Sequence, residues 1–136
     1  MPTAILSRRE TFSASHRLHS TELSDEENRT LFGKCNRPNG HGHNYVLNVL
    51  VKGGINTKTG LVMNLSDLQA IILQHVVDKV DHRHLNLDVP EFKTLNPTTE
   101  NFSVVIWNWL KPHLGELLYE IRLHETENNI AIYNGQ

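Results

Sequence analysis

The stretch Cys35-Asn-Arg-Pro-Asn-Gly-His41-Gly-His43-Asn-Tyr-Val-Leu-Asn-Val-Leu-Val51 carries the strongest signals of fold and function in this chain. From His41 onward the odd positions are the more apolar ones, which predicts a half-buried strand. On a strand, the i, i+2 spacing of His41 and His43 places both imidazoles on one face. Two imidazole nitrogens and a third histidine make the set of three protein ligands that leaves zinc an open fourth position. The stretch therefore predicts a catalytic rather than a structural metal centre.

Length and composition favour a single domain that spans residues 1–136. The 13 basic and 15 acidic residues give a formal charge of −2 and are mixed along the chain. They form neither a basic stripe for nucleic acid nor a polybasic membrane patch. Nine histidines against a single cysteine point toward metal or proton chemistry. Neither nucleic acid nor a membrane is expected as a partner.

Cellular location is indicated by what the sequence lacks. One cysteine cannot form an intrachain disulfide, and residues 1–9 contain no apolar segment of the kind found in signal peptides. No apolar run approaches the roughly 20 residues that span a bilayer. We therefore expect a cytoplasmic protein.

Hydrophobic periodicity predicts four main strands and two main helices. In chain order these are strand 4–16, strand 41–51, helix 65–80, a helix that follows Pro97-Thr98, strand 117–125 and strand 130–133. A capping-box pattern at Ser24-Asp25-Glu26-Glu27 predicts a short helix inside the long loop 17–40. Leu61-Val62-Met63 is expected to add a short extra strand.

Three polar residues are expected at one edge of the sheet. If the four strands run alternately up and down, the first ends at His16, the second begins at His41 and the third ends at Glu125. Each of these residues continues the apolar face of its strand. Their convergence favours a functional site over a solvated rim.

Cys35 lies in a polar, turn-rich segment between Lys34 and Arg37, whose positive charges are expected to favour its thiolate. A thiolate there can serve as a nucleophile, as a base, or as a fourth zinc ligand that closes the metal site. The residues alone leave these three roles open.

Asp81-His82 follows a predicted helix end, and two interpretations remain open for it. His82 can simply complement the helix dipole, or Asp81 can orient an imidazole that transfers protons. A direct hydrogen bond between these neighbours requires a turn. Two interpretations are also open for Glu125 and Glu100. Glu125 can simply end a strand, and Glu100 can simply stabilise the first turn of its helix. Alternatively, a buried carboxylate can accept two parallel N–H bonds from a guanidine-like ligand edge.

Several motifs, in this order, resemble the 6-pyruvoyltetrahydropterin synthase family of tunnelling-fold pterin enzymes over nearly the whole chain. They are Phe12-Ser13-Ala14-Ser15-His16-Arg17-Leu18, Phe32-Gly33-Lys34-Cys35-Asn36, Asn39-Gly40-His41-Gly42-His43-Asn44-Tyr45, Val62-Met63-Asn64-Leu65, Asp81-His82, Thr98-Thr99-Glu100-Asn101 and Glu125-Thr126. The resemblance implies an α+β tunnelling fold (T-fold) of ββααββ order, with a four-stranded antiparallel sheet and two helices packed on one face. It also implies that sheets join into a barrel in a homohexamer, a dimer of trimers with active sites between subunits.

The resemblance also assigns roles to individual residues. His16, His41 and His43 would bind one Zn²⁺ per subunit, and Cys35 would be the general base. Asp81 and His82 would relay protons. Glu125 would anchor the pterin, with Thr98, Thr99 and Glu100 as further substrate-binding candidates.

The implied reaction converts 7,8-dihydroneopterin triphosphate to 6-pyruvoyltetrahydropterin with elimination of triphosphate, a step of tetrahydrobiopterin biosynthesis. Arg17, Lys34 and Arg83 are candidate ligands of the triphosphate. One alternative is the related 6-carboxytetrahydropterin synthase of the queuosine pathway. That enzyme usually has a shorter gap between the cysteine and the H-x-H pair than the five residues found here. A second alternative is a non-catalytic, zinc-stabilised oligomeric scaffold with Cys35 as the fourth ligand.

Overall fold

Two 14-residue strands, β1 (Thr3–His16) and β2 (His41–Gly54), form the centre of the fold. In the computed structural model, which describes residues 1–136, they pair antiparallel along their whole length, from Thr3 opposite Gly54 to His16 opposite His41. Alternate residues of both strands are buried or half-buried, as the sequence periodicity predicts. Because the register is continuous, the histidines at the ends of the two strands lie directly opposite each other.

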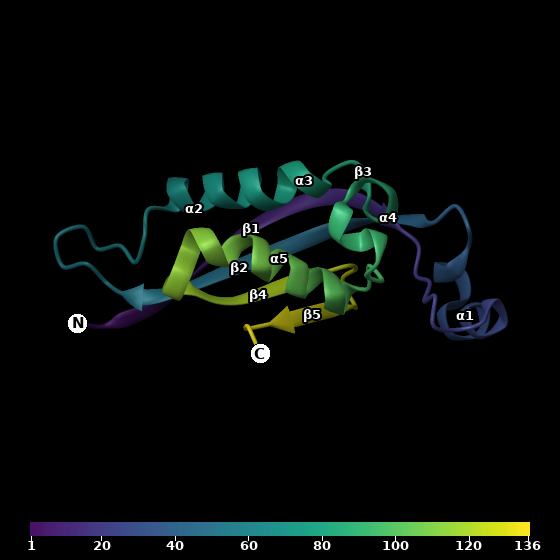
Figure 1. Cartoon of the computed structure of the whole chain (residues 1–136). Helices are drawn as coiled ribbons and strands as arrows, with labels where there is room; N and C mark the ends of the chain where they lie inside the picture. Colours follow the sequence, from purple (N-terminus) through teal and green to yellow (C-terminus); the bar gives the residue numbers. More distant parts are fainter.

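The sheet has five strands in the order β3-β1-β2-β4-β5 (Figure 1). β4 (Leu118–His124) and β5 (Ile130–Tyr133) extend the antiparallel pairing, so all four predicted strands are present. The addition is β3 (Arg83–His84), which pairs parallel with β1. A two-residue strand is too short to give any periodicity, which is why the four-stranded prediction lacked it.

The short strand predicted over residues 61–63 is wrong. Asn56 donates its backbone N–H to the Leu61 carbonyl at 3.0 Å, which closes a turn after β2. Val62 and Met63 pack against the core instead of pairing with the sheet. Their apolar character therefore reflects burial in a loop rather than strand pairing.

The short helix predicted in the long loop is confirmed as α1 (Asp25–Phe32), which continues into the 3₁₀ turn η1 (Gly33–Asn36). Its capping box is complete. Ser24 Oγ accepts from the Glu27 N–H at 3.0 Å, and Glu27 Oε1 accepts from the Ser24 N–H at 3.0 Å. These two bonds satisfy backbone donors that the helix itself leaves without partners.

The two main helical segments are also where they were predicted. The first runs through α2 (Leu65–Ile72), the π-helical turn η2 (Leu73–Val77) and α3 (Asp78–Val80). The second is α5 (Thr99–Leu114), capped by Thr98. Shorter helices complete the chain: α4 (Leu85–Asp88), η3 (Pro90–Lys93) and η4 (Gly115–Leu117). No helix is both long and apolar enough to cross a membrane.

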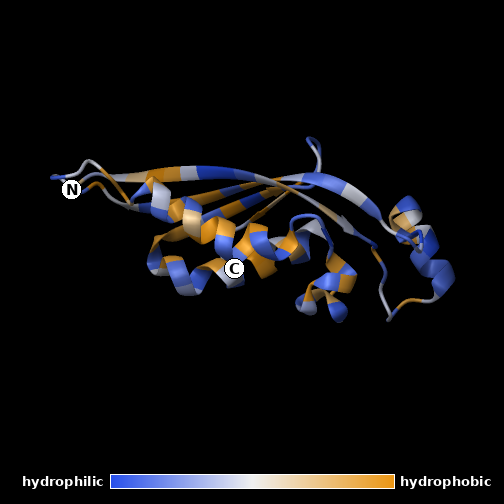
Figure 2. Ribbon diagram, turned by 90° about the horizontal axis from the view of Figure 1, so that it is seen from above, coloured by the Kyte–Doolittle hydropathy of each residue, from blue (hydrophilic) through white to orange (hydrophobic).

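The main helices cover one face of the sheet and leave the other face uncovered by helices (Figure 2). One connected cluster of 22 buried residues fills the space between the helices and the sheet. Near the site, Phe12 stacks on Tyr45 with ring centroids 5.2 Å apart, and Phe102 of α5 packs edge-on against both rings. Truncation of one such buried ring to alanine typically costs about 3–5 kcal/mol, so this aromatic cluster is a firm support beside the histidines.

Candidate metal centre and active site

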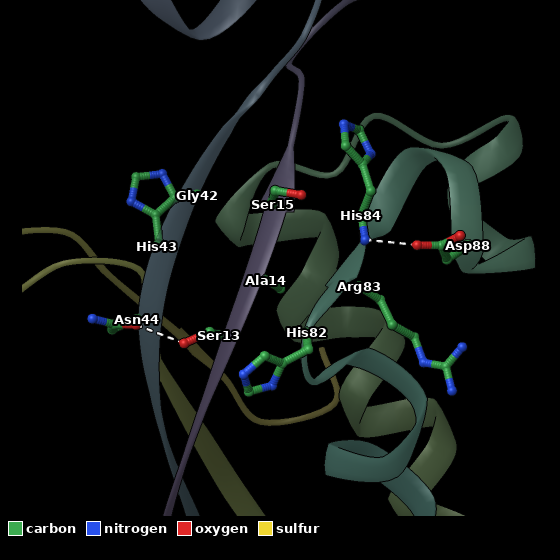
Figure 3. Close-up of a pocket in the computed structure, with 10 residues that line it drawn as sticks. All are labelled: Ser13, Ala14, Ser15, Gly42, His43, Asn44, His82, Arg83, His84 and Asp88. Carbon is green, nitrogen blue, oxygen red and sulfur yellow. Dashed lines mark hydrogen bonds between the residues drawn. The ribbon is translucent and has the colours of Figure 1, made fainter.

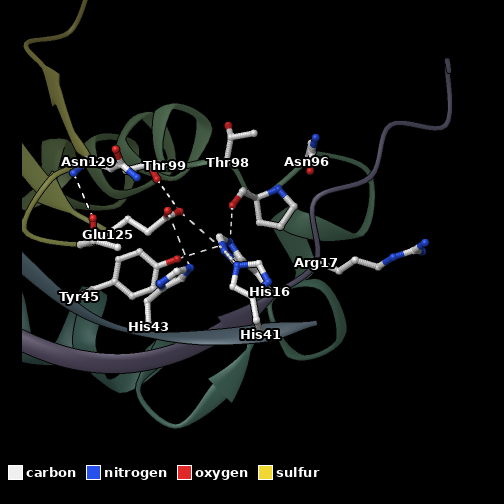
Figure 4. Close-up of polar contacts among 12 residues, drawn as sticks. His16, Arg17, His41, His43, Tyr45, Asn96, Thr98, Thr99, Glu125 and Asn129 are labelled. Atoms are coloured by element: carbon white, nitrogen blue, oxygen red, sulfur yellow. Dashed lines mark hydrogen bonds and ion pairs between the residues drawn. The ribbon is translucent and has the colours of Figure 1, made fainter. Parts of the chain in front are cut away.

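His16, His41 and His43 converge at the end of the β1–β2 pair (Figure 4). His16 is the cross-strand partner of His41, and His43 follows two residues later on the same face. The potential ligand atoms of the three residues all lie within 4.8 Å of one another. The Nε2 atoms of His16 and His41 are 3.1 Å apart. Strand pairing and the period of two therefore bring the three predicted ligands together.

Contacts around the cluster fix the orientation of His16. Its Nδ1 is 2.8 Å from the carbonyl oxygen of Pro97, to which it can only donate. That bond places the proton on Nδ1 and leaves the Nε2 lone pair facing the other two histidines. Metal-bound histidines are commonly held in this way by a backbone carbonyl.

The surroundings of His16 and His41 favour their neutral imidazoles. Burial lowers the pKa of His16 to about 4. Burial, followed by the neighbouring His43, also lowers the pKa of His41. Neutral imidazole is the form that binds metals.

Two ring nitrogens of the cluster, His41 Nδ1 and His43 Nε2, are buried without a hydrogen-bond partner. Unpaired buried polar atoms are costly, and a coordinated cation would remove that cost at His43. The three-histidine set contains neither Cys35 nor Glu125. The residues therefore fit a metal ion such as zinc bound through three protein ligands with a position left open.

Glu125 lies between the histidines and the start of α5. Its carboxylate oxygens are 3.7 Å from His16 Nε2 and 3.8 Å from His43 Nε2. Thr99 Oγ1 donates to Glu125 Oε2 at 2.8 Å. The side chain is only 14% exposed, so only a small part of the carboxylate is open to a ligand. The structure thus brings Glu125 and Thr99 together beside the metal centre.

The other two predicted substrate-binding residues lie at the same helix start but have different surroundings. Thr98 Oγ1 accepts from the Asn101 N–H at 3.1 Å and is used as the helix cap. Glu100 is exposed in the first turn. Neither side chain contacts the histidines within this protomer.

Cys35 is half-buried in the turn η1, and its carbonyl accepts from the Leu18 N–H at 2.9 Å. Burial, and then the negative charge of Glu125, raise the pKa of the Cys35 thiol. The prediction that Lys34 and Arg37 favour the thiolate is therefore wrong for the protomer alone. Both cations are exposed, so water screens them, whereas the thiol itself is partly desolvated.

Asp81 and His82 form the predicted pair through an unusual backbone conformation. His82 adopts the left-handed region with φ 61°, the one non-glycine residue to do so. This supplies the turn that brings His82 Nδ1 within 2.9 Å of Asp81 Oδ1. The Ser13 N–H donates to Asp81 Oδ1 at 3.0 Å, and this bond is the main reason why the pKa of Asp81 is lowered. Asp81 thus remains ionised and orients the ring.

The pair does not contact the metal centre of its own protomer. His82 is 83% exposed and lies across β1 from His43 (Figure 3). Ser13, which anchors the pair, is three residues before His16, about 10 Å along an extended strand. An open pocket of about 570 Å³ has both His43 and His82 in its lining. The structure therefore brings the histidines, Glu125 and Thr99 together but leaves His82 facing outward.

Two residues that support the site were not predicted from the sequence. The Pro97 carbonyl that orients His16 is a backbone group, so residue type gives no signal for it. Asn86 clamps the backbone of Arg17, accepting from its N–H at 2.8 Å and donating to its carbonyl at 2.9 Å. A motif that paired Arg17 with Asn86 would span 69 residues, which no local pattern reveals.

The fold and the site together define an α+β protein with a group of three histidines that could hold a metal ion at the end of a strand pair. Comparison of the chain with known proteins identifies its family. The model of the family described as 6-pyruvoyl tetrahydropterin synthase matches residues 5–136. A relative from Dictyostelium discoideum, named 6-pyruvoyl tetrahydrobiopterin synthase, is 51% identical and covers 98% of each chain. A human relative of the same name is 52% identical over 98% of this chain and 92% of its own.

Comparison with solved structures leads to the same family. The structure of Caenorhabditis elegans 6-pyruvoyl tetrahydropterin synthase matches with a TM-score of 0.96 and 43% identity, covering 100% of this chain and 98% of the other. The chain belongs to the 6-pyruvoyl tetrahydropterin synthase family, and it is an enzyme of the lyase type. The predicted tunnelling fold is confirmed, with a sheet that does not close within one protomer.

Proposed function

We propose that this protein is a zinc-dependent 6-pyruvoyltetrahydropterin synthase of tetrahydrobiopterin biosynthesis. It converts 7,8-dihydroneopterin triphosphate to 6-pyruvoyltetrahydropterin and eliminates triphosphate. The names of relatives about 50% identical over nearly the full chain support the reaction. The observation that carries the proposal is the open three-histidine centre beside the recessed carboxylate of Glu125.

The histidines provide the metal chemistry. His16, His41 and His43 would hold Zn²⁺, whose Lewis acidity makes a neighbouring C–H bond of the substrate side chain easier to deprotonate. The Pro97 carbonyl keeps His16 in the tautomer that presents Nε2 to the metal position.

Glu125 and Thr99 position the substrate. A pterin ring presents a guanidine-like edge with two parallel N–H donors, and a recessed carboxylate is their natural acceptor. Thr99 Oγ1 holds Glu125 Oε2 in place. Thr98 fixes the start of the same helix, and Glu100 stands exposed in its first turn, where it can meet a ligand or another subunit.

Proton transfer needs groups that one protomer does not bring together. We assign Cys35 as the base that removes a proton from carbon, and His82 as the group that returns protons. The raised pKa of Cys35 means that its thiolate needs further stabilisation, for which a nearby imidazolium is suited. Because His82 faces outward with Asp81 behind it, we assign the pair to the site of a neighbouring subunit.

The edges of the sheet support assembly. β3 and β5 are the outermost strands, and Ile130 and Ile132 of β5 are 47% and 60% exposed. Exposed apolar edge strands are liabilities unless they pair. We propose that edges join into a barrel in a homohexamer, built as a dimer of trimers, in which each chain folds as one domain over residues 1–136.

The decisive test is mass spectrometry of the pterin product after the zinc-loaded protein meets 7,8-dihydroneopterin triphosphate, with triphosphate release followed in parallel. A 6-pyruvoyl product with stoichiometric triphosphate is expected. A 6-carboxy product would instead place the protein in the queuosine pathway, and unchanged substrate would refute catalysis on this compound.

A further inference from the structure

A strongly cationic pocket of about 430 Å³ lies beside η1. Seven residues line it: Arg17, Arg29, Gly33, Lys34, Asn36, Arg37 and Pro38. Four of these are cations and none is acidic. The whole chain carries a formal charge of −2, so this concentration of positive charge is local. Such a concavity attracts anions.

The cations of the pocket have no anionic partner within the chain. None of the ion pairs in the structure involves Arg17, Arg29, Lys34 or Arg37. Arg17 donates through Nε to the Asn36 carbonyl at 2.9 Å, which holds its guanidinium while leaving the two terminal nitrogens free. Arg29, Lys34 and Arg37 are exposed and unpaired, so their side chains are available to an anion that enters the pocket.

The backbone around the pocket is well supported. Asn36 is buried, and its amide donates to the Leu18 carbonyl at 2.7 Å. Gly33 ends α1 with φ 56°, and its N–H donates to the Arg29 carbonyl. The Asn36 bond fixes η1 relative to the chain that follows β1, and the Gly33 bond ends α1. The arginines and the lysine therefore extend from an ordered backbone.

The pocket directly adjoins the proposed reaction site along the chain. Arg17 follows the metal-ligand candidate His16, and Lys34 and Asn36 flank Cys35. This adjacency in the chain favours a role for these cations in holding the substituents of a substrate that reacts at Cys35.

We propose that this pocket binds the triphosphate group of the substrate, an inference that rests on the proposed function. Guanidinium groups bind phosphate oxygens through two parallel hydrogen bonds, and Lys34 adds a point charge. The same contacts stabilise the negative charge of triphosphate as it leaves. Of the three cations predicted from the sequence, Arg17 and Lys34 belong to this subsite. Arg83 is not part of it, because it lines a different pocket together with His43 and His82.

The subsite can be tested without turnover, with inorganic triphosphate as the probe. Isothermal titration calorimetry on the zinc-loaded assembly should show binding that weakens as salt increases. Arg29→Gln and Arg37→Gln each change an exposed side chain that forms no hydrogen bond or ion pair within the chain. Each should raise the Kd about tenfold, because a hydrogen bond to a charged group is lost. Lys58→Gln, an exposed cation of the loop after β2, is the matched control and should leave the Kd unchanged.

Kinetics separates this inference from the proposed function. Raised KM for the triphosphate substrate and weakened triphosphate binding in the two variants, with the control unchanged, would support the subsite. Normal turnover with unaltered KM and Kd in both variants would overturn it while leaving the proposed function intact. A third outcome is that the protein shows no turnover but binds triphosphate, and that Arg29→Gln and Arg37→Gln weaken this binding. That outcome would refute the proposed function but support an anion site. Loss of assembly by sedimentation in either variant, with triphosphate affinity retained, would show that the cations instead pair across a subunit interface.

Discussion

Acidification of the metal-free protein is expected to reveal the buried His16 as a loss of folding stability. His16 is fully buried, and its pKa lies at about 4 in the folded protein against 6.5 for an unperturbed histidine. Below pH 6.5 the unfolded chain takes up a proton at this position, while the folded chain does not until the pH approaches 4. Protonation therefore favours the unfolded state throughout this interval.

The size of the effect follows from the two pKa values. Each pH unit over which only the unfolded state is protonated is worth about 1.4 kcal/mol. The interval from 6.5 to about 4 therefore corresponds to about 3 kcal/mol of stability lost from His16. This stability is fully present above pH 6.5 and falls as the pH is lowered toward 4. A typical domain has only about 5–15 kcal/mol of stability in total, so the loss is measurable.

Urea unfolding with a chelator present, at one fixed protein concentration and between pH 7.5 and 4, measures this loss. The matched variant is His16→Asn, whose amide can still donate to the Pro97 carbonyl but does not titrate. Groups other than His16 titrate in both proteins, so their contributions largely cancel in the comparison. The free energy of unfolding of the wild type should fall by about 3 kcal/mol more than that of the variant. Parallel pH profiles for the two proteins would refute the assignment of a neutral, buried His16.

Three further substitutions, the last paired with a control variant, probe the site and its surroundings. Cys35→Ala should keep the fold and the zinc content while turnover falls about 10²–10⁴-fold, as metal analysis and product formation would show; loss of zinc instead would make the cysteine a ligand. Thr99→Val removes the 2.8 Å bond to Glu125 and should raise the KM for the pterin about tenfold with zinc content unchanged; an unaltered KM would contradict the positioning role. Gly40→Ala and Gly60→Ala both place alanine at φ +75°. The added Cβ at Gly40 would lie 2.8 Å from the His16 carbonyl oxygen and 2.9 Å from His84 Nε2, whereas the Cβ at Gly60 would meet no other atom. Thermal unfolding should therefore show Gly40→Ala to be about 1–3 kcal/mol less stable than Gly60→Ala, and equal stabilities would argue against the close contact.

The parts of the fold that the sequence predicts are those with a strong local period or a short-range chemical pattern. Alternation runs along β1 and along β2 as far as Val49, which leaves little ambiguity in strand type or face. The capping box at Ser24 and the threonine cap of α5 mark helix starts for the same reason. The convergence of the three histidines belongs with these features, because His41 and His43 share a strand and His16 lies in register with His41.

Features that depend on tertiary contacts could not be predicted in this way. β3 is too short for a period, and Val62 and Met63 are apolar because they pack against the core from a turn. The charge of Glu125 acts on Cys35 across 90 positions of sequence, whereas the neighbouring cations that suggested a thiolate are screened by water. In each case a nonlocal contact outweighs the local pattern.

The two halves of the proposed site differ in how they are built, and this difference has a functional consequence. The metal-binding half is completed inside one protomer by strand pairing, with the Pro97 carbonyl and Thr99 as its supports. The proton-transfer half is anchored to β1 by backbone bonds with Ser13 and presents His82 to the outside. A left-handed residue costs on the order of 1–3 kcal/mol, and such strain persists where the surrounding structure holds it in place for a function. In the proposed assembly, each protomer would hold the metal by itself, and the outward-facing His82 would complete the proton-transfer groups of a neighbouring subunit.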